Sequence, residues 1–224
     1  MTPAEIDAAL DAAEQALIFP KPVVLSGTGY WQVVATLKRD RSLVERYADR
    51  VGAIDQAAFL SWAPIVVPFW PGTILAVGGS LLALGLVALA YTIDAPWNGL
   101  SFLAGTLGLL VATHGLGHLA VGSLLGIRFT VWFAGFRWPQ PGIKTDYASY
   151  LRAPARQRAW MHASGAIVTK IIPFLLIPSA LIAGVPWWTT ALLVVLAVAQ
   201  LLTDALWSTK SSDWSKYRRE MAID

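Results

Sequence analysis

The chain has 224 residues, of which 56% are hydrophobic and only 14% are charged, whereas soluble domains carry about 25% charged residues. The net charge of +3 is small, and the basic residues lie between apolar segments, so we expect no nucleic-acid partner. The absence of cysteine excludes disulfides and thiolate metal ligands.

Three long stretches of the sequence lack charge altogether. No charged residue lies between Asp55 and Asp94, between Asp94 and Arg128, or between Lys170 and Asp204. Each stretch is longer than the roughly 20 apolar residues that a helix needs to cross a bilayer. The sequence therefore predicts an all-α polytopic integral membrane protein, embedded in a lipid bilayer by about four transmembrane helices.

We predict three regions in chain order. These are a small N-terminal α+β region at residues 1–56, a transmembrane domain at 57–215 and a tail at 216–224. The N-terminal region opens on Thr2-Pro3-Ala4-Glu5, which has the pattern of a helix capping box with proline at the first helical position. Its predicted elements are a helix over 2–17, a hairpin of 23–25 with 30–36 around the glycine-containing turn, and a helix over 41–59 that lies on the membrane surface or packs on the hairpin.

Prolines, glycines and charges delimit the predicted spans. Pro64, Pro68 and Pro71 interrupt the first apolar stretch, so residues 57–70 are predicted to be an interfacial segment that precedes the first span. The predicted spans are residues 71–92, 97–125, 162–183 and 187–207.

The basic residues alternate between the connections of these spans. They occur in the N-terminal region, in the long loop 126–161 and after the last predicted span, from Lys210 onward, and only Lys170 of the 17 basic residues lies elsewhere. The positive-inside rule then predicts that both termini and the long loop are cytoplasmic. We expect a multi-pass protein of a prokaryotic cell membrane.

Two histidines stand in the second predicted span. His114 and His118 are four residues apart, so they share one helix face and both imidazoles can reach one metal ion. The alternative is a pair of histidines that hydrogen-bond across the helix bundle. Ionisable groups are costly inside a membrane helix, and this favours metal binding.

A catalytic zinc needs three protein ligands and a water, so a third ligand is required. The candidates are Asp213, Asp204 and His162, because each lies at or near the end of a predicted span on the side where His114 and His118 lie. The residues themselves do not decide among the three.

The segment His114-Gly115-Leu116-Gly117-His118-Leu119 resembles the H-E-L-G-H-L stretch of the site-2 protease family of intramembrane zinc metalloproteases. The segment from Leu202 to Trp214 is similar in placement to that family's N-P-x-x-x-x-D-G region, and Ser164-Gly165-Ala166 resembles the Gly-Pro pair before its next span. The resemblance covers roughly residues 98–215. It implies zinc held by His114, His118 and Asp213, a position for Asp204 near the family's Asn, and hydrolysis of a peptide bond in or near the membrane.

One position departs from the family's pattern. The Glu that serves as general base in H-E-x-x-H is replaced here by Gly115. General base catalysis contributes about 10²–10⁴-fold, so the resemblance implies an impaired enzyme, and whether the chain is an enzyme stays open. It is either a naturally non-proteolytic relative or a chain in which the Glu has been replaced.

The long loop carries an alternating segment, Ile127 to Phe133, which then reaches Gly135 and Gly142. It predicts a β-hairpin at the membrane surface over residues 127–143. In the resembled family such an element offers its edge to an extended membrane-protein or peptide substrate. The alternative is an interfacial loop anchored by aromatic residues.

Lys170 is predicted to pair with Asp204, the only carboxylate in a neighbouring span. The alternative partner is a backbone carbonyl. Two other functions compete with proteolysis. One is a non-catalytic pseudo-protease that binds a membrane helix, and the other is a metal transporter, which the almost wholly apolar segment 100–110 disfavours.

Overall fold

A computed structural model of the chain describes residues 1–18, 22–135, 141–206, 209 and 212–223. The chain divides into two compact units, and both are discontinuous in sequence. Unit 1 comprises Met1–Phe69, Gly122–Arg158 and Glu220–Asp224, and unit 2 comprises Trp70–Val121 and Ala159–Arg219. The three predicted regions 1–56, 57–215 and 216–224 follow the chain order, whereas these units do not.

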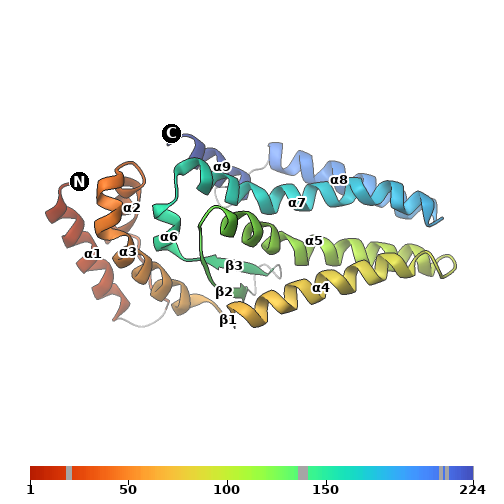
Figure 1. Cartoon of the computed structure of the whole chain (residues 1–224), viewed down its shortest axis with the longest axis horizontal. Coiled ribbons are helices and arrows are strands. Elements are labelled where there is room, and N and C mark those ends of the chain that lie inside the picture. The colour runs from red at the N-terminus through yellow and green to blue at the C-terminus, as the bar shows by residue number, and fades with distance from the viewer. Residues whose placement is uncertain (19–21, 136–140, 207–208, 210–211, 224) are drawn as a thin grey trace. The chain divides into compact units, whose positions relative to one another are not determined.

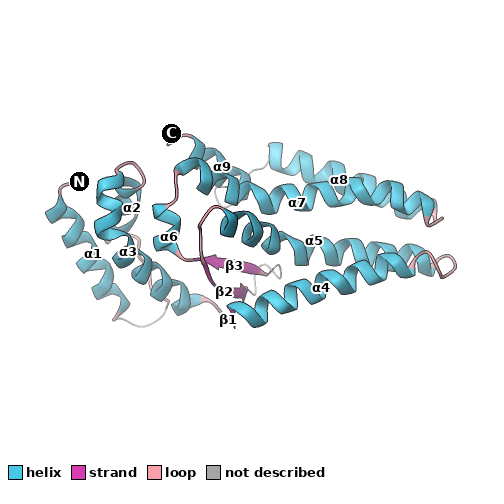
Figure 2. Cartoon of the chain, in the orientation of Figure 1, coloured by secondary structure: helices cyan, strands magenta, loops and turns pink. Residues whose placement is uncertain are grey.

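Unit 1 is built from helices and a small sheet (Figures 1 and 2). Its elements are α1 (Pro3–Leu17), α2 (Tyr30–Leu37), α3 (Arg41–Trp62), β1 (Ile65–Pro68), β2 (Phe129–Ala134), β3 (Gly142–Thr145) and α6 (Tyr147–Arg152). The predicted capping box is confirmed at the start of α1. The Thr2 side chain accepts a hydrogen bond from the backbone N–H of Glu5, and the Glu5 side chain accepts one from the backbone N–H of Thr2.

The predicted N-terminal hairpin is wrong. Residues 30–37 form α2, and its buried residues Tyr30, Val33, Val34 and Leu37 have helical spacing. Gly29 caps this helix with φ of 85°, a left-handed conformation that glycine adopts without steric cost. The glycine-containing segment therefore starts a helix, and the region before residue 57 is helical where an α+β region was predicted.

The predicted hairpin of residues 127–143 is present as β2 and β3, although residues 136–140 lie outside the described part. β2 also pairs antiparallel with β1, Ile65 opposite Ala134, so the described strands form one sheet of order β1-β2-β3. Within the segment 57–70, α3 continues to Trp62 and the strand β1 follows, and the interfacial location of this segment stays a prediction. Since β2 has a partner on both sides, only β1 and β3 present unpaired edges among the described strands.

Unit 2 contains the long apolar helices. In the described part of the chain, four helices are long and apolar enough to span a membrane, namely Phe69–Leu89 (α4), Trp97–Leu124 (α5), Ala155–Ile182 (α7) and, within α8 (Trp187–Leu206), residues Trp187–Asp204. The four predicted spans correspond to these helices, except that α7 begins well before residue 162. Trp207, the predicted end of the last span, lies outside the described residues. A further helix, α9 (Asp213–Met221), was not predicted.

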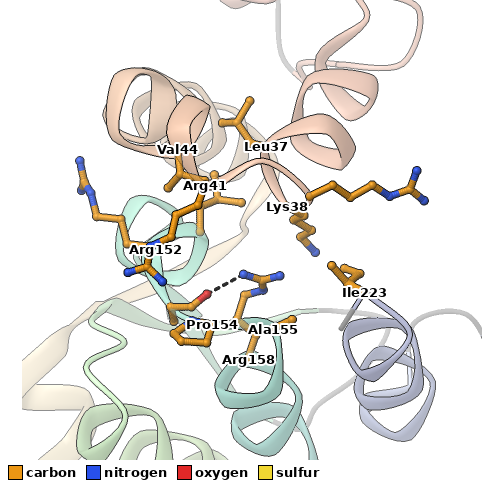
Figure 3. Close-up of a pocket in the computed structure, with 12 residues that line it drawn as sticks. Leu37, Lys38, Arg41, Val44, Arg152, Pro154, Ala155, Arg158 and Ile223 are labelled. Carbon is orange, nitrogen blue, oxygen red and sulfur yellow. Dashed lines mark hydrogen bonds between the residues drawn. The ribbon is translucent and has the colours of Figure 1, made fainter.

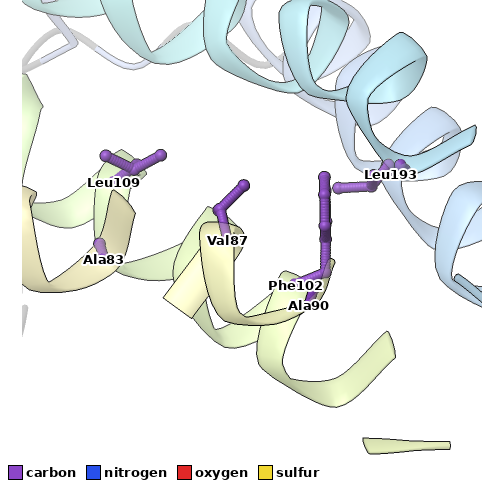
Figure 4. Packing of buried hydrophobic residues seen from close by; sticks show 7 residues of the cluster. Ala83, Val87, Ala90, Phe102, Leu109 and Leu193 are labelled. Carbon is purple, nitrogen blue, oxygen red and sulfur yellow. The ribbon is translucent and has the colours of Figure 1, made fainter. Parts of the chain in front are cut away.

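The outward faces of these helices are apolar, as expected for helices that meet lipid. Leu75, Leu82, Leu181 and Val195 are all more than 60% exposed, whereas a water-facing helix presents polar residues on its outer face. The interior of the bundle is a cluster of buried residues from α4, α5, α7, α8 and the turn that follows α4 (Figure 4), and it comprises Ala83, Val87, Ala90, Phe102, Leu109, Ala180 and Leu193.

Small residues bring the later part of α5 against the earlier part of α7. A Cβ on Gly117 would lie 3.1 Å from the Ser164 carbonyl oxygen and 3.2 Å from the Gly165 Cα. Such close backbone approach is characteristic of small residues at membrane-helix contacts. It holds the histidine-bearing part of α5 next to the first half of α7.

Candidate metal centre

Three side chains of unit 2 converge on one point. His114 and His118 lie one turn apart on α5, and Asp213 is the first residue of α9. The Nε2 atoms of the two histidines are 3.3 Å apart, and Oδ2 of Asp213 lies 3.1 Å from His114 Nε2 and 3.2 Å from His118 Nε2. The three atoms therefore form a nearly equilateral triangle.

The size of this triangle matches a tetrahedral zinc site. Zinc binds histidine nitrogen at about 2.0–2.1 Å and carboxylate oxygen at about 2.0–2.2 Å, which makes neighbouring ligand atoms of a tetrahedron about 3.3 Å apart. The observed separations of 3.1 to 3.3 Å lie close to this value. One ion could bind all three atoms with little rearrangement, and the fourth position would remain for water or substrate.

The tautomer of His118 is set by the backbone of α7. Nδ1 of His118 lies 2.7 Å from the carbonyl oxygen of Met161, and a carbonyl only accepts, so Nδ1 carries the proton. In the neutral ring Nε2 then presents a lone pair toward the Asp213 carboxylate. Two acceptor atoms that lie 3.2 Å apart need a proton or a cation between them. Metal-binding histidines usually donate their other ring N–H to a carboxylate, a backbone carbonyl or a water, as His118 does to the Met161 carbonyl.

Asp213 is held in its ionised form. Burial raises the pKa of its carboxyl group, but the contacts of Asp213 with His114 and His118 and the positive charge of Lys216 outweigh that effect, and the pKa is lowered overall. Its second oxygen, Oδ1, accepts a hydrogen bond from Lys216 Nζ at 3.1 Å. Asp213 therefore faces the histidines with a negatively charged oxygen and keeps one oxygen for a supporting contact.

The other two candidates for the third ligand lie elsewhere. The Asp204 carboxylate forms an ion pair with Lys170, which is the pairing predicted from the sequence. His162 lies on α7 and is not in the group formed by His114, His118 and Asp213, whose ligand atoms lie within 4.8 Å of one another. Of the three alternatives, the structure brings only Asp213 to the two histidines.

Gly115 is buried on α5, next to His114. It has no side chain that could accept a proton from a bound water. The four glutamates of the chain, Glu5, Glu14, Glu45 and Glu220, all belong to unit 1. Unit 2 therefore contains no glutamate that could replace the missing general base.

Besides Lys216, two contributors to the site were not predicted as such. One is the Met161 carbonyl, and a backbone group carries no residue-type signal. The other is Gly165, where an added Cβ would lie 2.4 Å from Nε2 and 2.6 Å from Cε1 of the His118 ring. The sequence identified this glycine by resemblance, and its physical role is to leave room for the imidazole.

We expect Gly165→Ala to displace the His118 ring and to weaken metal binding at least tenfold. Overpacking of this kind costs about 1–3 kcal/mol of stability. The control is Gly85→Ala, because a Cβ at Gly85 meets no atom within 4 Å. Competition titrations with a chromophoric chelator measure both affinities, and equal affinities in the two variants would contradict this role of Gly165.

Comparisons of this chain with protein-family models, with curated proteins and with solved structures found no match.

Proposed function

We propose that this chain is an intramembrane zinc metalloprotease of the site-2 protease type whose peptide hydrolysis is impaired at Gly115. The observation that carries the proposal is the triangle of His114 Nε2, His118 Nε2 and Asp213 Oδ2, with His118 oriented by a backbone carbonyl. A His/His/carboxylate set with a fourth position open is typical of catalytic zinc.

His114, His118 and Asp213 would hold the metal. The chemistry that zinc supplies when bound is polarisation of a peptide carbonyl and a lowered pKa, to about 7, of a bound water. Met161 keeps His118 in the metal-binding tautomer, and Lys216 orients the Asp213 carboxylate. Gly115 supplies no base, so proton removal from the attacking water would be left to solvent.

The substrates we propose are membrane proteins or peptides. The site residues lie on α5 and at the start of α9, next to the long apolar helices. If the basic connections face the cytoplasm, the site opens toward that side and both termini are cytoplasmic. A prokaryotic cell membrane is the setting we propose.

A non-catalytic pseudo-protease is the second candidate. The observation that favours it is Gly115, because loss of the base leaves the metal ligands intact. Such a protein would keep the metal as a structural element and bind a membrane helix without cleaving it. Metal content is the same under both candidates, whereas turnover differs.

Metal content tests the site that both candidates share. We expect about one zinc per chain in purified wild-type protein and almost none in His118→Ala, because two remaining ligands bind zinc weakly. His162→Ala is the matched control, since it removes a histidine of the same bundle that lies outside the cluster. Elemental analysis after dialysis against trace zinc gives the stoichiometry.

Equal metal content in wild type and His118→Ala would overturn the proposal. Absence of metal from folded wild-type protein would do the same, and a proton shared between the histidines and Asp213 would then explain the geometry.

A further inference from the structure

Unit 1 contains a pocket of about 310 Å³ that the proposed protease function does not use. It lies where the end of α2, the start of α3, the end of α6 and the first turn of α7 meet (Figure 3). This volume lies at the lower end of the range of about 300–1,000 Å³ typical of small-molecule sites. Its apolar lining comes from residues such as Leu37, Val44 and Leu151.

The polar lining of this pocket is basic. The charged residues that line it are Lys38, Arg39, Arg41, Arg152 and Arg158, and no acidic residue among those that the structure describes lines it. Carboxylates behind the lining neutralise part of this charge, since Glu220 pairs with Lys38 and Arg158 and Asp49 pairs with Arg152. Arg39 and Arg41 form no ion pair with the described residues, so the pocket keeps an excess of positive charge.

Arg158 is the buried member of the set, with 3% of its surface exposed. Its Nε donates to Glu220 Oε2 at 2.6 Å, and its Nη1 donates to the Ala153 carbonyl oxygen at 2.6 Å. The third nitrogen, Nη2, is buried and has no hydrogen-bond partner among the described residues. A buried charged donor without an acceptor is costly, so an acceptor from a ligand is the expected complement.

The start of α7 adds to this preference for an anion. Pro154, Ala155 and Arg158 all line the pocket, and α7 is a helix of 28 residues. The first N–H groups of a helix lack intrahelical acceptors, and together with the helix dipole they favour a bound anion. The pocket thus combines a helix N-terminus with three arginines that have free donors with respect to the described residues: Nη2 of Arg158 and the side chains of Arg39 and Arg41.

We propose that this pocket binds a phosphate group, either as a free phosphate compound or as the head group of an anionic phospholipid. A phosphate offers several acceptor oxygens and more than one negative charge, which suits a guanidinium fork together with helix N–H groups. A single carboxylate would satisfy fewer of these donors. The proposal does not depend on the metal centre, because all the lining residues belong to unit 1.

Two binding experiments on the full chain distinguish a free phosphate compound from a phospholipid head group. In nanodiscs of phosphatidylcholine alone, calorimetry with inorganic phosphate and with pyrophosphate measures a soluble ligand. In nanodiscs that contain phosphatidic acid, ³¹P spectra of the lipid and the thermal stability of the protein measure a head group. Saturable binding in either arm supports the proposal and identifies the source, whereas binding in neither arm overturns it.

Substitutions of lining residues test whether the phosphate binds in this pocket. The double variant Arg39→Gln/Arg41→Gln alters exposed side chains and should weaken binding about tenfold or more, as expected for lost hydrogen bonds to a charged group. Arg158→Lys keeps a cation beside Glu220 but removes Nη2, and should weaken binding by a similar factor. The matched control is Arg156→Gln, which removes an exposed arginine of the same helix turn that does not line the pocket. Equal affinity in the control and in Arg39→Gln/Arg41→Gln would overturn the proposal, whatever the folding of Arg158→Lys.

Discussion

Gly115→Glu should raise the rate of peptide hydrolysis by about 10²–10⁴-fold, the usual contribution of a positioned general base. Residue 115 follows His114 directly on α5 and lies one turn before His118. A carboxylate there would lie beside the metal position and could take a proton from a water bound by the metal. The measurement is single-turnover cleavage of a transmembrane substrate whose helix is weakened by glycine and proline.

The matched variant is Gly115→Gln, which has nearly the same shape but cannot act as a base, and it should remain as slow as the wild type. His118→Ala in the Gly115→Glu background should abolish the gain. Since Gly115 is buried, thermal stability and metal content must be measured beside the rate. A folded Gly115→Glu protein that binds zinc and cleaves no faster would contradict the protease proposal and favour the pseudo-protease.

Local signals in the sequence predicted the local elements well. The capping box placed the start of α1, and the charge-free stretches placed the helices long enough to span a membrane. The segment 30–36 was wrongly predicted to be a strand because its apolar residues fit both a strand and the i, i+3, i+4 spacing of a helix. In the structure Gly29, in a left-handed conformation, caps a helix that begins at the next residue. The strand at Ile65–Pro68 was missed because its partner, β2, lies in a distant part of the sequence.

The candidate metal centre also combines residues that are close in the sequence with residues that are distant in it. Two histidines four residues apart are visible as a pair in any helix. The choice of Asp213 over Asp204 depends on a contact across 95 residues, and resemblance alone indicated it. The ion pair between Lys170 and Asp204 could be predicted since an unpaired charge in a membrane helix is costly, whereas the Met161 carbonyl carries no side-chain signal.

Glu220→Gln should destabilise unit 1 by about 3–5 kcal/mol, the usual effect of removing one partner of a buried charge network. The sequence assigned Glu220 to a tail, but only 3% of its surface is exposed. Its Oε1 pairs with Lys38 and accepts from the Tyr150 hydroxyl at 2.8 Å, and its Oε2 accepts from Arg158 at 2.6 Å. The amide would leave two cations of unit 1 without their carboxylate.

The pH dependence of this effect has a defined sign. Burial raises the pKa of Glu220, but Lys38 and Arg158 outweigh it, so the folded-state pKa lies below the ordinary value of 4.5. The stabilisation by Glu220 is therefore fully present above about pH 4.5 and is lost as the pH falls through the folded-state pKa. The difference in stability between wild type and Glu220→Gln should accordingly shrink on acidification.

Hydrogen exchange of the unit 1 helices at several pH values measures this difference in detergent without requiring the whole chain to unfold. The matched control is Glu45→Gln, since Glu45 is 68% exposed and lies 3.9 Å from Arg152. Exposed pairs contribute at most about 1 kcal/mol, so the control should change exchange little at any pH. If Glu220→Gln behaved like the control near neutral pH, the side-chain carboxylate of Glu220 would not stabilise unit 1. The end of α9 would then be a tail, as the sequence suggested.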